Sequence, residues 1–201
     1  FYSAEDADSE GEEGKFYFWT KDEIENALNE EEAELIIKVF NIKKEGNYID
    51  QLKSSKTGDN IFHLKDSLEK IGVEKGVSLK KIELQVEMVR QKLFTIREKR
   101  VHPYKDDKTL TDWNGLMIAA LAKGGQAFDE PAYTKAAKQA ADFILNNMRS
   151  STGRLMHRYR AGDAALSAMI ADYAYFTWGL LELYEATFDV KYIDAAIELT
   201  E

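Results

Sequence analysis

An internal repeat of about 60 residues constrains the fold of this chain more than any other feature of its sequence. The segment 128–137 recurs as 188–196: each begins with Phe-Asp and continues to a tyrosine and a pair of alanines. Upstream, Asp112 and Asp172 lie 60 positions apart, and a long apolar segment follows each. A period of this length fits one helical hairpin with its connection, which cannot bury its apolar face alone. The repeat therefore predicts hairpins that stack against one another.

Stacked hairpins of this kind form an α/α toroid when they are arranged in a ring. The chain has only two prolines, which favours long helices. We therefore expect a mainly α fold, a partial α/α toroid of helical hairpins with short β-hairpin connections. Two clear hairpins are too few to close a ring, so residues 1–201 should form one incomplete domain. Its expected parts are an inter-hairpin β segment at 1–19, helices with a long loop at 20–100, and two helical hairpins at 101–201.

Local signals place the expected elements. The aromatic stretches at 1–2 and 15–19 predict a short hairpin, or two extended arms joined by the acidic turn between them. Residues 41–62 are rich in loop signals, including Ser54 and Ser55. Residues 154–160 alternate as an extended segment. Helices are predicted from Thr20, which begins a capping box, from Ser78 to about Arg100, from Asp112 to about Phe128, from Pro131, from just after Gly162 to about Thr187, and from Asp189.

Composition narrows the class of protein. The 36 acidic residues against 27 basic ones give a net charge of -9, which argues against a general nucleic-acid binder. The chain has no cysteine, which excludes disulfides, thiolate metal sites and a cysteine nucleophile and fits a cytoplasmic protein. No apolar run approaches the roughly 20 residues of a membrane span, and no signal peptide is visible. Because Phe1 begins within an apparent strand, we expect the sequence to be part of a longer chain.

Three blocks of the sequence carry a resemblance to a known family. They are 1–21 with its acidic turn, 106–117 (Asp-Asp-Lys-Thr-Leu-Thr-Asp-Trp-Asn-Gly-Leu-Met), and 172–187, which begins Asp-Tyr-Ala-Tyr. Together they resemble the family of spermatogenesis-associated protein 20 and the bacterial protein YyaL. The resemblance implies a thioredoxin-like domain elsewhere in the parent chain and a toroid related to six-hairpin glycosidases and N-acylglucosamine 2-epimerases. The segment before Asp172 is commonly acidic in that family, whereas it is Met-Ile-Ala here, which weakens the case for a second carboxylate at that point.

The acidic turn holds the first candidate site, formed by Glu5, Asp6 and Asp8. Two carboxyl groups in different environments can serve as general acid and general base on a glycosidic bond. The alternative is a solvated acidic turn. The turn also resembles the start of an EF-hand calcium loop, but Tyr17 stands where that loop needs a bidentate glutamate. The sequence therefore predicts no metal site.

The second candidate site is formed by Asp112, Trp113 and Asn114, at the expected start of a helix facing the mouth of the toroid. Asp112 either caps that helix or contributes a catalytic carboxylate. Trp113 offers a ring on which a sugar can stack.

The third candidate site combines His157 and Arg158 with Asp172 and Tyr173. Histidine can move a proton near neutral pH, as a sugar epimerase requires next to a carbonyl group. A surface histidine on an extended segment is the alternative, and Asp172 could equally be a cap within its helix.

These groups predict a carbohydrate-related toroid domain that binds or acts on a saccharide. Its catalytic candidates are Asp6, Asp8, Asp112, His157 and Asp172, and its substrate-binding candidates are Glu5, Trp113, Asn114, Arg158 and Tyr173. We expect no cofactor, no nucleic-acid partner and no membrane partner. A non-catalytic sugar- or protein-binding module and a plain scaffold are the alternatives.

Overall fold

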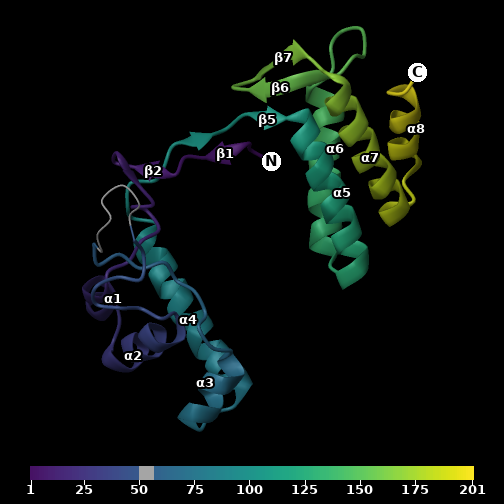
Figure 1. The fold of residues 1–201 in the computed structure, drawn as a ribbon. Coiled ribbons are helices and arrows are strands. Elements are labelled where there is room, and N and C mark those ends of the chain that lie inside the picture. The colour runs from purple at the N-terminus through teal and green to yellow at the C-terminus, as the bar shows by residue number, and fades with distance from the viewer. Residues whose placement is uncertain (50–56) are drawn as a thin grey trace. The chain divides into compact units, whose positions relative to one another are not determined.

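A computed structural model describes residues 1–49 and 57–201. The part of the expected loop that contains Ser54 and Ser55 lies outside the described residues. The mainly α class is confirmed: the described residues form eight helices and a few short antiparallel strand pairs (Figure 1). The chain divides into two compact units. Unit 1 contains Phe1–Glu5 and Lys105–Glu201, and unit 2 contains Asp6–Tyr104.

Unit 2 is built from four helices and one small hairpin. The helices are α1 (Lys21–Ala27), α2 (Glu30–Val39), α3 (Leu68–Lys75) and α4 (Leu79–Arg97). Each begins after a polar side chain that accepts a hydrogen bond from the first turn, and the capping box of Thr20 and Glu23 is formed as predicted. Two apolar clusters join these helices, one around Trp19, Ile36 and Leu93 and one around Val39 and Ile82.

The N-terminal hairpin spans fewer residues than predicted. Strand β2 (Asp8–Ser9) pairs with β3 (Glu12–Glu13) inside the acidic turn, and Glu10 and Gly11 turn the chain at φ values of 54° and 79°. The flanking aromatic stretches form no strand with each other. Phe16 and Trp19 are instead buried, because packing against helices removes more of their apolar surface from water than a two-stranded ribbon can.

Unit 1 contains the repeated hairpins. Its strands are β1 (Ala4–Glu5), β4 (Lys105–Asp106), β5 (Thr109–Leu110), β6 (Met156–Arg160) and β7 (Asp163–Ser167). Its helices are α5 (Thr111–Phe128), α6 (Pro131–Asn147), α7 (Ile170–Thr187) and α8 (Val190–Glu198). Helices α5 and α7 have 18 residues each, as a repeat requires. Strand β1 pairs with β4, and the order of the larger sheet is β5-β6-β7, all antiparallel.

The helix predicted to start just after Gly162 begins eight residues later, at Ile170. Ala161 and Gly162 form a tight turn at φ values of 50° and 86°, and the chain then returns along β6 as strand β7. The Ala-Ala-Leu segment of β7 has high helix propensity, but pairing with β6 outweighs it.

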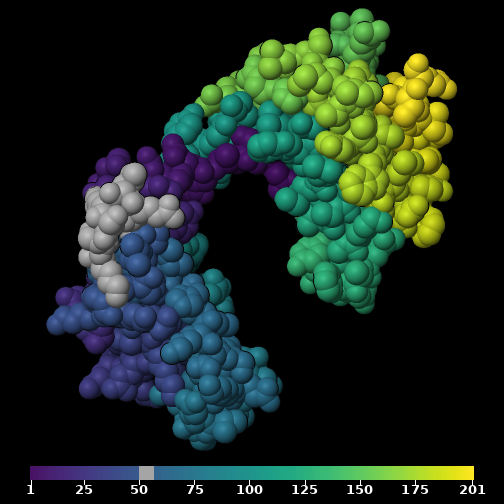
Figure 2. All heavy atoms as spheres, in the orientation of Figure 1, coloured from purple at the N-terminus to yellow at the C-terminus, as the bar shows by residue number. Residues whose placement is uncertain are grey.

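Helices α5 and α7 approach each other so closely that their backbones touch at two glycines. A Cβ atom added to Gly115 would lie 2.5 Å from the carbonyl carbon of Tyr175 and 2.6 Å from the nitrogen of Phe176. One added to Gly179 would lie 2.7 Å from the oxygen of Gly115. The space-filling view shows the two helices in contact (Figure 2). This crossing holds the first turns of both helices side by side.

The core of unit 1 lies between these helices, their hairpin partners and the sheet, and includes Ile118, Ala141, Phe176, Leu180 and Tyr192. Across the part of the chain that the structure describes, no helix has the length and apolar character needed to cross a bilayer.

Candidate functional site

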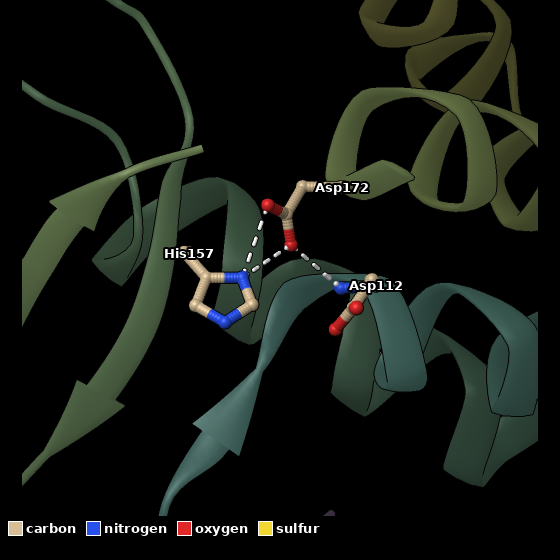
Figure 3. A group of neighbouring side chains, drawn as sticks. All are labelled: Asp112, His157 and Asp172. Atoms are coloured by element: carbon tan, nitrogen blue, oxygen red, sulfur yellow. Dashed lines mark hydrogen bonds and ion pairs between the residues drawn. The ribbon is translucent and has the colours of Figure 1, made fainter. Parts of the chain in front are cut away.

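Asp112, His157 and Asp172 converge at one point in unit 1 (Figure 3). Asp112 lies in the first turn of α5, His157 is the second residue of β6, and Asp172 lies in the first turn of α7. One nitrogen or oxygen atom from each residue lies within 4.8 Å of the corresponding atoms of the other two. The structure therefore brings together one residue of the second predicted site and two of the third.

Asp172 is the buried centre of the group. Its side chain is only 1% exposed. Oδ1 accepts a hydrogen bond from the backbone nitrogen of Asp112 at 3.0 Å, and Oδ2 accepts one from that of Met169 at 2.8 Å. These donors lie at the N-termini of two helices, whose positive ends favour a negative charge. Asp172 thus caps its own helix, which is one of the two alternatives left open by the sequence, and it also links this helix to α5.

His157 completes a dyad with this carboxylate. Nδ1 lies 2.9 Å from Oδ1 and 3.0 Å from Oδ2 of Asp172. Because an ionised carboxylate can only accept, we assign the proton of the neutral imidazole to Nδ1. Nε2 then carries a free lone pair, and Figure 3 shows it pointing away from Asp172. Among the described residues both of the ring's hydrogen bonds involve Nδ1, and the side chain is 19% exposed. The geometry therefore leaves a proton acceptor on the side of the ring away from the buried carboxylate.

The three residues of the second predicted site, Asp112, Trp113 and Asn114, have different surroundings. Asp112 makes no capping bond of its own, because its helix begins one residue earlier at Thr111 after Leu110. Its Oδ1 accepts a hydrogen bond from the nitrogen of Trp113 at 2.8 Å. The Trp113 side chain is 54% exposed, whereas Asn114 is buried. Asn114 bonds both the nitrogen of Phe1, at 2.7 Å, and the oxygen of Phe1, at 3.1 Å, so it anchors the first strand segment to α5.

The remaining predicted substrate contacts lie outside the convergent group. Arg158 follows His157 on β6 and therefore projects from the opposite face, where it bonds Asp163 at 3.4 Å. The hydroxyl of Tyr173 accepts a hydrogen bond from the nitrogen of Leu155 at 3.2 Å, and its ring packs against the core. Arg158 and Tyr173 therefore contact other parts of unit 1 and are not members of the convergent group.

The acidic-turn candidates are divided between the two units. Glu5 is exposed on β1 of unit 1. Asp6 and Asp8 belong to unit 2, where Oδ1 of Asp6 accepts a hydrogen bond from the nitrogen of Asp8 at 3.1 Å. This bond is typical of a turn closed by an aspartate side chain.

The convergent group also has the donor types of a cation site. A histidine nitrogen and two carboxylates suit zinc or another transition metal. However, hydrogen bonds engage Nδ1 of His157 and both oxygens of Asp172. The arrangement therefore favours an oriented acid–base pair over a set of metal ligands.

Two contacts that build the site were missing from the sequence prediction. The buried hydroxyl of Thr111 donates to the oxygen of Met156 at 2.7 Å and joins the start of α5 to β6. The nitrogen of Met169 holds Asp172 from the residue before α7. An acidic residue three positions into a helix is a usual capping signal, but it becomes visible only once α7 is known to start at Ile170.

No model of a known protein family matches this chain. It is 30% identical over 227 aligned residues to spermatogenesis-associated protein 20 of Rattus norvegicus and 29% identical over 227 to that of Homo sapiens. In both cases the match covers 100% of this chain and 29% of the relative. An uncharacterized protein of Caenorhabditis elegans is 26% identical over 99% of this chain and 30% of its own length.

The chain therefore spans less than a third of the relatives that it matches. The thioredoxin-like domain expected elsewhere in the parent chain stays a prediction. The resemblance itself is confirmed: along its whole length, this chain is similar to one part of spermatogenesis-associated protein 20.

Proposed function

We propose that unit 1 performs general acid–base chemistry on a saccharide, with His157 as the catalytic residue and Asp172 as the residue that positions it. One observation carries this proposal: a carboxylate that is 1% exposed holds Nδ1 of His157 and leaves Nε2 unbonded among the described residues. A base held in this way is ready to take a proton from a ligand atom placed within hydrogen-bond distance.

The reaction that fits a single histidine base is proton exchange at the carbon next to a sugar carbonyl. Nε2 removes the proton from that carbon, the C–H electron pair forms a carbon–carbon double bond, and the carbonyl oxygen takes the negative charge. The imidazolium exchanges its proton with solvent and returns one to the same carbon, where the electron pair of the double bond re-forms the C–H bond and the charge on the oxygen re-forms the carbonyl group. Asp172 stabilises the imidazolium between the two steps, because its charge lies against Nδ1.

Two features favour a saccharide as the ligand. Trp113 is 54% exposed and lies in the first turn of α5 beside Asp112, so its ring offers an apolar face at that end of the helix. The sequence motifs resemble a family whose toroid is related to sugar epimerases.

Hydrolysis by two carboxylates is less consistent with the geometry. A glycosidase needs both carboxyl groups in contact with the scissile bond or with an attacking water. Asp172 is buried, and its oxygens are bonded to two backbone nitrogens and His157. Asp112 would be the only carboxylate of the group that is available to a ligand.

The test is solvent deuterium exchange in D₂O, followed by proton NMR at C2 of glucose, mannose and N-acetylglucosamine. We expect the full chain to catalyse loss of the C2 proton signal from at least one sugar. His157→Gln should abolish this exchange, and His102→Gln should leave it unchanged, because His102 lies in unit 2 and contacts Phe16. Exchange that survives in the folded His157→Gln variant would refute the proposal, as would its absence from the wild-type chain with all three sugars.

A further inference from the structure

A second feature of unit 1 is a cleft of about 680 Å³ near the sheet. This volume lies within the range of roughly 300–1,000 Å³ that is usual for small-molecule sites. The N-terminal segment, strand β6 with the turn that follows it, and helix α6 supply most of its walls. The residues that line the cleft are Phe1, Tyr2, Asp107, Thr109, Phe143, Tyr159, Arg160, Ala161 and Gly162.

The walls combine aromatic rings with one arginine–aspartate ion pair. Phe143 and Tyr159 meet edge to face, with ring centroids 5.0 Å apart. Tyr2 is 60% exposed, and the amine of Lys105 lies 4.9 Å from the centroid of its ring. Nε of Arg160 donates to Oδ1 of Asp107 at 2.6 Å. Aromatic faces suit the apolar face of a sugar ring, and a guanidinium–carboxylate pair offers both donors and acceptors to its hydroxyl groups.

Strand β6 connects this cleft to the dyad. Tyr159 and His157 are two residues apart and therefore project from the same face of the strand, with Cα atoms about 7 Å apart. On the neighbouring strand, Thr109 pairs with Tyr159 and lies two residues before Thr111, the first residue of α5. One ligand of two sugar rings could reach both the cleft and Nε2 of His157.

From this arrangement we infer that the cleft is a subsite for a second sugar ring, so that the substrate is a reducing disaccharide or a longer reducing saccharide. This inference rests on the proposed function for the position of the reacting ring. Proton exchange next to a carbonyl requires a ring that can open, which places the reducing end at His157. The ring joined to it by the glycosidic bond occupies the cleft, and its contacts supply binding energy away from the reacting carbon.

Binding is measured first, by isothermal titration with cellobiose, maltose and N,N′-diacetylchitobiose and with the corresponding monosaccharides. At least one disaccharide should bind the full chain roughly tenfold more tightly than its monosaccharide, which corresponds to about 1.4 kcal/mol. Tyr2→Ala and Arg160→Gln should each reduce this preference at least severalfold. The matched controls are Tyr104→Ala, an equally exposed tyrosine of unit 2, and Arg90→Gln, whose arginine is ion-paired with Glu87 on α4. Neither control should change the preference.

The outcomes separate this inference from the proposed function. Disaccharide binding that persists in His157→Gln, together with no deuterium exchange in the wild-type chain, would refute the proposed chemistry and keep the cleft as a sugar subsite. Equal affinity for disaccharides and monosaccharides would overturn the subsite, and so would a preference unchanged in both Tyr2→Ala and Arg160→Gln. Circular dichroism confirms beforehand that each variant is folded, and Tyr2→Ala alone decides the matter if Arg160→Gln does not fold.

Discussion

Replacing Gly115 by alanine tests whether the contact between α5 and α7 holds the site together. The added Cβ would meet backbone atoms of Tyr175 and Phe176 at 2.5 and 2.6 Å, far inside normal contact distance. Backbone cannot rotate away as a side chain can, so the two helices must move apart to admit the added Cβ. Overpacking of this kind costs about 1–3 kcal/mol, and we expect the upper end because the helix backbone must move.

A second glycine on the same helix provides the matched control. A Cβ on Gly124 would lie 3.4 Å from the nearest atom of the Tyr133 ring, which is an ordinary contact. Alanine is about 1 kcal/mol more favourable than glycine inside a helix. The free energy of unfolding should therefore rise by about 0.5–1 kcal/mol for Gly124→Ala and fall by about 2 kcal/mol for Gly115→Ala.

Urea unfolding of the full chain, followed by circular dichroism at 222 nm, measures both changes. If the slope of the unfolding free energy against urea concentration is unchanged, the variants expose the same amount of surface on unfolding as the wild type. Gly115→Ala should also lower deuterium exchange at C2 of the sugar, because separating the helices draws the Asp112 nitrogen away from Asp172. A Gly115→Ala chain at least as stable as the wild type would refute the argument from helix contact.

Three further predictions concern the dyad and the core. Asp172→Asn should lower the free energy of unfolding by about 1–3 kcal/mol and slow C2 exchange at least tenfold, since an amide cannot accept from all three donors as a carboxylate does; Asp163→Asn, at an exposed position, should do neither. Added Zn²⁺ should inhibit C2 exchange by occupying Nε2 of His157, and EDTA should restore the exchange. The control is the Asp112→Asn variant, provided that it remains active. If zinc still inhibits this variant, the carboxylate of Asp112 is not needed to bind the zinc. Burial raises the pKa of Tyr192 from 10.0 to about 12, so the stability from its neutral phenol is complete below pH 10 and lost as the pH rises toward 12. The urea midpoint should therefore fall less steeply over that pH range in Tyr192→Phe than in the wild type. The test is the difference between the two chains, because the raised pKa of Lys191, which bonds Asp142, lowers stability in the same direction in both.

The repeat in the sequence was sufficient to predict the helical hairpins of unit 1. Apolar spacing and caps placed α5, α6 and α8 within a residue or two of their observed starts. The start of α7 was wrong because strand β7 depends on pairing with β6, a contact that local propensity does not describe.

The candidate site was predictable as a set of residue types but not as a geometry. His157 and Asp172 were both singled out, yet nothing in their spacing says that strand β6 passes the first turn of α7. That proximity depends on the small residues Gly115 and Gly179, which let α5 and α7 touch, and on Thr111, which ties α5 to β6. Arg158 and Tyr173 were nominated because they adjoin these residues in sequence, but alternation along the strand and packing in the core direct them elsewhere.

Because one buried carboxylate accepts from both Asp112 and Met169, the same atoms that orient the imidazole also close the first turns of two helices. Fraying of either helix end would release the ring long before the hairpins unfold. Amide hydrogen exchange at Asp112 and Met169 would then report how often the base loses its orientation. Temperature should lower turnover in step with these local openings, well below the midpoint of global melting.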